Sequence, residues 1–108
     1  MEVITRLVGE KAAVIFSRST CDMCHSIKAL ISGYGANPTV YELDEMGPEG
    51  EAVDRALVEL LGCRPSVPAV FIGQRFVGGE KQVMSLQIKN RLAPMLMSAG
   101  AIWLWNGH

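Results

Sequence analysis

The sequence predicts an α/β domain in which an antiparallel hairpin extends a sheet that helices cover on its faces. Two observations carry this prediction. Segments with apolar residues at helical spacing alternate with short apolar or alternating runs along the whole chain. Two of the extended runs are separated only by Gly73-Gln74, a pair typical of a hairpin turn. Alternating helices and strands of this kind pack in layers around a sheet.

The first part of the chain predicts two helices and two strands. Apolar residues at helical spacing indicate a helix over Glu2–Lys11, and the apolar run Ala12–Phe16 is typical of a buried strand. A second helix is expected over Cys24–Tyr34, ending near Gly33. Residues Thr39–Leu43 then alternate between apolar and polar side chains, which predicts a second strand.

The second part begins with a helix that Gly47-Pro48 introduces and that Gly62 stops. Two further strands complete the predicted sheet: Val67–Ile72 and Arg75–Val77. The pattern is helical again over Glu80–Ala99, and Pro94 predicts that this stretch divides into two helices.

Composition limits the classes of function. The chain has 108 residues, of which 49% are hydrophobic, and a net charge of −1, so we expect one folded domain over residues 1–108 with residues 100–108 as an apolar C-terminal tail. The absence of a polybasic run argues against direct binding of nucleic acid or an anionic membrane. Without a signal-like N-terminus, and with an odd number of cysteines, three, the protein is expected in a reducing compartment.

The pair Cys21 and Cys24 is the main candidate for chemistry. Two thiols three positions apart, between a predicted strand and a predicted helix, can reach each other and react. At the N-terminus of a helix, unpaired backbone N–H groups and the peptide dipoles favour the thiolate form of the first cysteine. The pair therefore predicts a redox site.

Two metal-based alternatives use the same residues. Cys21 and Cys24 followed by His25 match the Cys-x-x-Cys-His signature of covalent haem attachment, but that use needs an exported chain. A zinc site could add Cys63 and His108, yet two clean ligand pairs are absent. We therefore expect no metal ligands.

Three motifs together resemble the glutaredoxin family: Ser17–Cys24, Ser66–Pro68 and Phe76–Gly79. The resemblance covers nearly the whole chain and is strongest to the plant-specific class called CC-type or ROXY glutaredoxins. It implies a thioredoxin-like fold with a four-stranded mixed sheet flanked by helices. It also implies a glutathione-dependent thiol-disulfide oxidoreductase.

Family resemblance assigns the catalytic roles. Cys21 would be the nucleophile that attacks a glutathione mixed disulfide or a protein disulfide, and Cys24 would be the resolving thiol, buried one helical turn later. Arg18 would stabilise the thiolate and a glutathione carboxylate.

The resemblance also implies a glutathione site. Pro68 would be in the cis form and would turn the backbone of Val67 toward an extended peptide such as glutathione. Gly79 would let the backbone approach the ligand at the start of the next helix. Glu80 is the acidic residue of this site, because Lys81 occupies the position where many glutaredoxins have an acid.

Besides Lys81, the chain departs from the family pattern between the cysteines, where it has Asp22 and Met23 instead of Pro and an aromatic residue. A carboxylate beside Cys21 disfavours the thiolate, because like charges repel. An iron-sulfur cluster shared between two subunits through Cys21 and glutathione is a further alternative known for some glutaredoxins, and [2Fe-2S] is not expected here by default.

The tail Ala101-Ile102-Trp103-Leu104 resembles the ending through which the plant class contacts TGA transcription factors of the bZIP type. The resemblance implies regulation of such a factor and location in both the cytoplasm and the nucleus. The alternative function is a transcriptional adaptor or repressor that keeps the fold without catalysis. An apolar ending can also fold back on its own domain instead of forming an interface.

Four sulfur-containing residues are given structural roles. We expect Cys63, at the end of a predicted helix, to be a buried and inert thiol. Met84, Met95 and Met97 lie at or near helical spacing and are expected to pack in the core.

Overall fold

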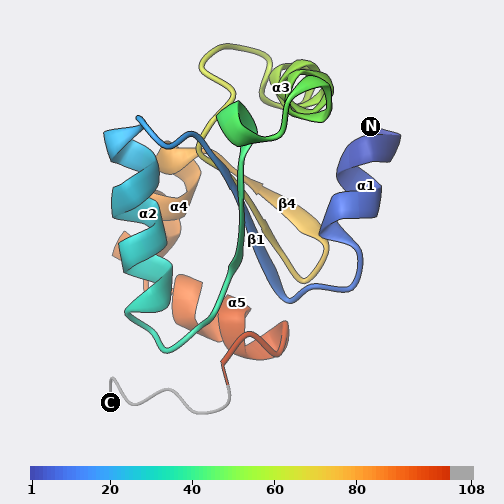
Figure 1. The fold of residues 1–108 in the computed structure, drawn as a ribbon. Coiled ribbons are helices and arrows are strands. Elements are labelled where there is room, and N and C mark those ends of the chain that lie inside the picture. The colour runs from blue at the N-terminus through green and yellow to red at the C-terminus, as the bar shows by residue number, and fades with distance from the viewer. Residues whose placement is uncertain (103–108) are drawn as a thin grey trace.

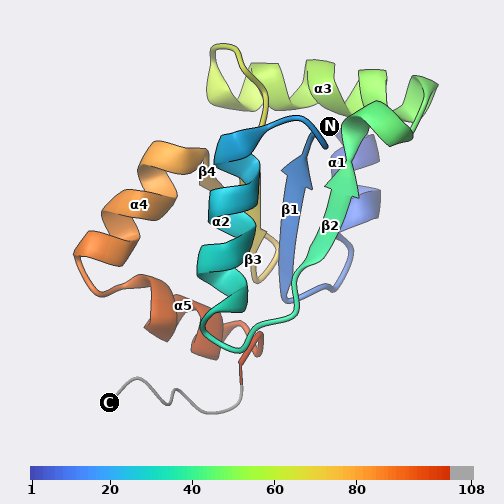
Figure 2. The same ribbon diagram turned by 60° about the vertical axis from the view of Figure 1, so that its left-hand side comes forward.

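The computed structural model describes residues 1–102, which form a four-stranded mixed sheet with helices on both faces (Figures 1 and 2). The strands are β1 (Ala13–Ser17), β2 (Thr39–Glu42), β3 (Ala69–Ile72) and β4 (Arg75–Gly78). Their order across the sheet is β2-β1-β3-β4. β1 pairs in parallel with β2 and antiparallel with β3, and β3 and β4 form the antiparallel hairpin. The α/β fold class and all four predicted strands are confirmed.

Residues 1–102 also form five α-helices and one 3-10 helix: α1 (Glu2–Val8), α2 (Asp22–Ser32), η1 (Leu43–Glu45), α3 (Pro48–Leu61), α4 (Glu80–Ile88) and α5 (Leu92–Ser98). Figure 1 shows α1 and α3 on one face of the sheet and α2, α4 and α5 on the other. The predicted division of the last helical stretch is confirmed, with Pro94 in the first turn of α5. The short helix η1 was not predicted.

Alternation along β1 explains the two layers. Val14 and Phe16 belong to the core cluster that includes residues of α1 and α3, whereas Ala13 and Ile15 belong to the cluster with α2, α4 and α5. All five residues of β1 are buried, because the strand lies inside the sheet and is covered on both faces.

Helix boundaries follow local signals. α1 ends at Val8, three residues earlier than predicted, because Gly9 has a φ of 51° that an L side chain rarely adopts. α3 ends as predicted at Gly62, which is in the left-handed conformation. α2 begins at Asp22 with Cys21 as its N-cap, two residues before the predicted start. Because α2 starts earlier than predicted, Cys21 lies at its N-terminal end.

The predicted packing of the methionines is largely wrong. The exposed fractions of Met84 and Met97 are 40% and 41%, and only Met95 packs against the core. Helical spacing alone could not distinguish the exposed methionines from the packed one, because α4 and α5 are short and each buries only a narrow stripe of side chains.

The first residues of the tail lead from the exposed Gly100 to the buried Ile102. Ile102 is 5% exposed and belongs to the same cluster as α5, and Ala101 packs against that cluster. Trp103 and Leu104, the other residues of the predicted partner contact, lie outside the described residues. Within residues 1–102, no helix has both the length and the apolar composition needed to cross a membrane.

Candidate active site

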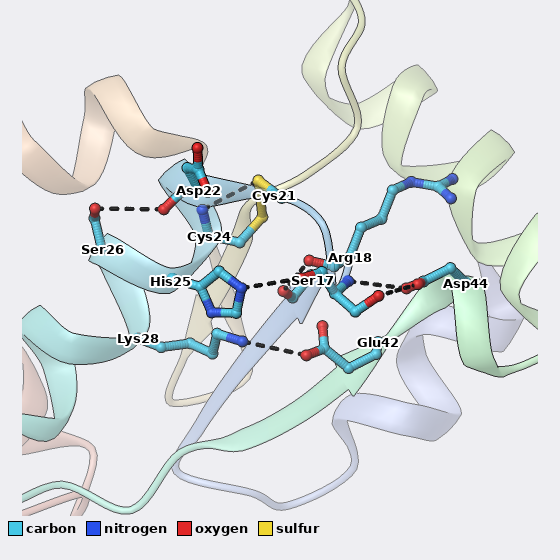
Figure 3. The surroundings of a disulfide bond; sticks show 11 residues. Ser17, Arg18, Cys21, Asp22, Cys24, His25, Ser26, Lys28, Glu42 and Asp44 are labelled. Carbon is cyan, nitrogen blue, oxygen red and sulfur yellow. Dashed lines mark hydrogen bonds and ion pairs between the residues drawn. A yellow bond between two sulfur atoms is a disulfide. The ribbon is translucent and has the colours of Figure 1, made fainter.

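The two cysteines meet where β1 gives way to α2. Their sulfur atoms lie at disulfide distance, and their Cα atoms are 5.2 Å apart (Figure 3). Cys24 is fully buried, as predicted for the second thiol, whereas Cys21 is partly exposed. A substrate can therefore reach Cys21 more easily than Cys24.

The first turn of α2 supplies a donor to the Cys21 sulfur. The backbone N–H of Cys24 donates a hydrogen bond to Cys21 Sγ over 3.1 Å. This N–H is one of the groups that the helix itself cannot satisfy, and a donor at this position stabilises negative charge on sulfur. The geometry thus favours Cys21 as the reactive thiol.

A cavity of about 500 Å³ opens beside Cys21. Six of the seven predicted site residues line it: Arg18, Cys21, Val67, Pro68, Gly79 and Glu80. They come from the loop after β1, the loop before β3 and the start of α4. Tertiary structure thus brings together segments that are far apart in the sequence.

Two backbone features shape the far wall of this cavity. The peptide bond between Val67 and Pro68 is cis, as predicted. A Cβ atom on Gly79 would lie 3.4 Å from the carbonyl oxygen of Pro68, so the two segments lie close together. The N–H of Gly79 donates to Oε1 of Gln82 over 2.9 Å, which caps α4.

Arg18 makes a contact that the sequence did not predict. Its Nη2 lies 3.1 Å from Oδ1 of Asp54, a residue of α3, and Figure 3 shows its side chain extending away from the two sulfur atoms. Arg64 pairs with the other oxygen of Asp54, again over 3.1 Å, and the Ser66 hydroxyl donates to Oδ1. Asp54 therefore joins three chain segments.

Asp54 is the main functional candidate that the sequence reasoning missed. Its side chain is 12% exposed, and the Ser66 hydroxyl, followed by Arg18 and Arg64, lowers the pKa of its carboxyl below the ordinary range. A signal was present in the sequence, because Asp54 lies between Val53 and Leu57 on a helix whose apolar stripe is buried. A carboxylate there needs cationic partners.

The loop between Arg18 and Cys21 is held from two sides. Asp44 accepts hydrogen bonds from the N–H of Ser19, over 3.0 Å, and from the Ser19 hydroxyl, and these bonds lower the pKa of Asp44. The carbonyl oxygen of Ser19 lies 3.0 Å from Nε2 of His25 on α2. The unpredicted helix η1 thus anchors the loop that leads to Cys21.

Cys63 corrects another expectation. It is a free and exposed thiol that lines the same cavity as Cys21, so the prediction of a buried residue is wrong. The reason is that α3 ends at Leu61, which leaves Cys63 in the loop that follows. Lys81 also lines the cavity beside Glu80.

The described part of the chain contains no cluster of side chains suited to bind a metal ion. Among residues 1–102, no three His, Cys, Asp or Glu side chains come together in a group that could hold a metal ion. His108, a residue of the zinc alternative, lies outside the described residues.

Comparison with curated proteins finds plant relatives over nearly the whole chain. The chain is 64% identical over 104 residues to monothiol glutaredoxin-S1 of Arabidopsis thaliana, which covers 96% of this chain and 100% of the relative. It is 50% identical, with the same coverage, to glutaredoxin-C1 of Oryza sativa subsp. japonica. Unlike a monothiol protein, this chain carries a second cysteine in its pair.

Solved structures agree with this result. The fold matches a buckwheat glutaredoxin-glutathione complex with a TM-score of 0.85 and 36% identity, over 94% of this chain and 93% of that one. It also matches the holo form of glutaredoxin C1 from Populus tremula x tremuloides with a TM-score of 0.83 and 35% identity, over 94% and 89% of the two chains. The glutaredoxin family model matches residues 13–77, from β1 to β4. With this match, its thioredoxin-like fold and its paired cysteines, the chain belongs to the glutaredoxin family.

Proposed function

We propose that this protein is a glutathione-dependent thiol-disulfide oxidoreductase that acts through Cys21 and Cys24. One observation carries the proposal: Cys21 caps α2, accepts a hydrogen bond from Cys24 N–H and lines a cavity, with Cys24 at disulfide distance behind it. An accessible sulfur with a backbone donor is suited to attack a disulfide, and a buried second thiol is suited to resolve the product.

Glutathione is the proposed ligand of the cavity. A buckwheat relative with 36% identity has been solved as a complex with glutathione. In this protein, the backbone of Val67 beside cis-Pro68 would pair with the extended tripeptide, and Gly79 with the N-terminus of α4 would receive a carboxylate. Arg18 and Glu80 would bind the charged ends of the ligand.

The proposed reaction consists of two successive thiol–disulfide exchanges. The Cys21 thiolate attacks the glutathione sulfur of a mixed disulfide, and the substrate leaves as a thiolate that takes up a proton. Cys21 is then bonded to glutathione. Either a second glutathione attacks that bond and leaves as oxidised glutathione, or Cys24 attacks Cys21 and releases reduced glutathione, leaving the Cys21–Cys24 disulfide.

The test is reduction of a small glutathione mixed disulfide by the purified protein with glutathione, glutathione reductase and NADPH. We expect turnover that the Cys21→Ser variant lacks. A folded wild-type protein without turnover would overturn the catalytic proposal and leave the adaptor function, in which the fold is kept and the chemistry is lost.

We further propose membership of the plant CC-type class and regulation of a TGA-type transcription factor, with location in the cytoplasm and nucleus. Relatives from Arabidopsis and rice, and the likeness of Ala101–Leu104 to the class ending, support this proposal. Ile102 is a core residue, so the partner contact is assigned mainly to Trp103 and Leu104.

Calorimetric titration of a purified TGA factor tests this assignment. A variant with Trp103→Ala and Leu104→Ala should lose binding and keep turnover, whereas Cys21→Ser should lose turnover and keep binding. If the tail variant binds as tightly as the wild type, the contact is assigned to the wrong residues.

A further inference from the structure

A single buried carboxylate on α3 connects the two loops that carry most of the candidate active site. Asp54 accepts from Arg18 in the loop after β1, from Arg64 in the loop after α3, and from Ser66 in the segment that leads into cis-Pro68. Arg18 and Arg64 line the cavity beside Cys21, whereas Asp54 lies behind them. The arrangement therefore places two cations along the cavity that Cys21 also lines, with their counter-ion behind them.

The carboxylate of Asp54 is buried, whereas the two arginine side chains reach the solvent. The side chain of Asp54 is 12% exposed, compared with 40% for Arg18 and 65% for Arg64. Each guanidinium has five N–H donors, and Asp54 accepts from one nitrogen of each, Nη2 of Arg18 and Nη1 of Arg64. Both arginines thus keep donors for a second anion that enters the cavity.

Two arginines would not hold this arrangement by themselves. Their like charges repel, and each long side chain loses rotamer freedom when it is fixed in one place. A carboxylate between them offsets both costs, and the hydrogen bond from the buried Ser66 hydroxyl fixes the orientation of that carboxylate. The fixed pair then presents a ready-made receptor for a carboxylate.

We propose that Asp54 is a positioning residue that holds Arg18 and Arg64 together as a receptor for a substrate carboxylate, and so makes the site prefer anionic thiols such as glutathione to uncharged ones. This inference rests on the proposed function. Asp54 itself does not touch the substrate and acts through the two arginines.

Single-turnover kinetics with two matched substrates test the inference. One fluorescent peptide carries a mixed disulfide with glutathione, and the same peptide carries instead a mixed disulfide with 2-mercaptoethanol, which has no charge. The ratio of the two second-order rate constants measures the preference. We expect Asp54→Asn to lower that ratio about tenfold, equivalent to ~1.4 kcal/mol, mainly through the glutathione substrate.

Three further variants test whether Asp54 acts through the two arginines. Glu49→Gln removes a carboxylate from the same helix and breaks an ion pair with Arg6 on the surface, outside the residues that line the cavity, so the ratio should stay at the wild-type value. Adding Arg64→Gln to Asp54→Asn should lower the ratio by less than the sum of the two separate effects, because both changes disrupt one unit. Asp54→Glu, which keeps the charge, should recover part of the preference.

The outcomes separate the two claims. A wild-type protein that reduces neither peptide overturns the proposed function, whatever Asp54 does. An active wild type together with a folded Asp54→Asn variant of unchanged ratio overturns the positioning role. If Asp54→Asn does not fold, Arg64→Gln decides, since Arg64 is 65% exposed and can be replaced without opening the core. An unchanged ratio in that variant also overturns the inference.

Discussion

The backbone N–H of Cys24 donates a hydrogen bond to Sγ of Cys21 across 3.1 Å in the first turn of α2. The donor belongs to the peptide backbone, so it is independent of the side chain at position 24. Several Arabidopsis relatives are named monothiol glutaredoxins, including one that is 64% identical to this chain. The two roles of Cys24, as a backbone donor and as a thiol, can therefore be separated by mutation.

Replacing Cys24 by Ser keeps the N–H and removes the thiol that we propose resolves the mixed disulfide. We expect the variant to retain most of the turnover with a glutathionylated substrate, because glutathione itself can resolve the Cys21 mixed disulfide. Its reduction of a protein disulfide with glutathione absent should fall to background. A Cys24→Ser variant as inactive as Cys21→Ser toward glutathionylated substrates would contradict this prediction.

Gly50 in α3 packs directly against η1. A Cβ atom at this position would lie 2.1 Å from the carbonyl oxygen of Leu43, closer than real Cβ contacts allow. Gly50→Ala should therefore destabilise the protein by about 1–3 kcal/mol, despite the better helix propensity of alanine. Urea unfolding measures the effect, and Glu59→Ala, an exposed change in the same helix, should stay within about 0.5 kcal/mol of the wild type. An equally stable Gly50→Ala variant would show that η1 is free to move.

Protonation of Asp54 at acid pH should lower the free energy of unfolding of the protein. Its pKa is lowered in the folded state by the Ser66 hydroxyl and then by Arg18 and Arg64, so its stabilising contribution is complete at neutral pH. That contribution is lost as the pH falls through the folded-state pKa, which lies below the ordinary range. The difference in free energy of unfolding between the wild type and Asp54→Asn should therefore shrink as denaturation is repeated at lower pH. A difference that does not change with pH would contradict the assignment.

Replacing Ile102 tests whether this residue of the tail is part of the hydrophobic core. It is 5% exposed and packs in the cluster that includes α5, so Ile102→Ala should cost about 2–5 kcal/mol in a denaturant titration. Met97 is 41% exposed, and Met97→Ala should have little effect by comparison. Equal effects of the two changes would place Ile102 outside the core.

Local patterns predicted more of the fold than of the site. The hairpin at Gly73-Gln74 and the helix stop at Gly62 are signalled by residues next to each other in the chain, and both were found where expected. Met84 and Met97 were misplaced because spacing along a helix does not say how wide its buried stripe is. That width depends on which neighbouring elements cover the helix.

By itself the sequence determined the α/β class, the order of the strands and α-helices, and the motifs that carry Cys21, Cys24 and Pro68, because each depends on residues close together in the chain; the cis form of Pro68 followed from the family resemblance. Only the tertiary structure decided that Asp54 lies beneath Arg18 and Arg64 and that Cys63 opens onto the Cys21 cavity. Those contacts join α3 and the loop after it to the loop after β1. A contact between a carboxylate and a guanidinium 36 positions apart depends on how helices pack on the sheet, which no local pattern encodes.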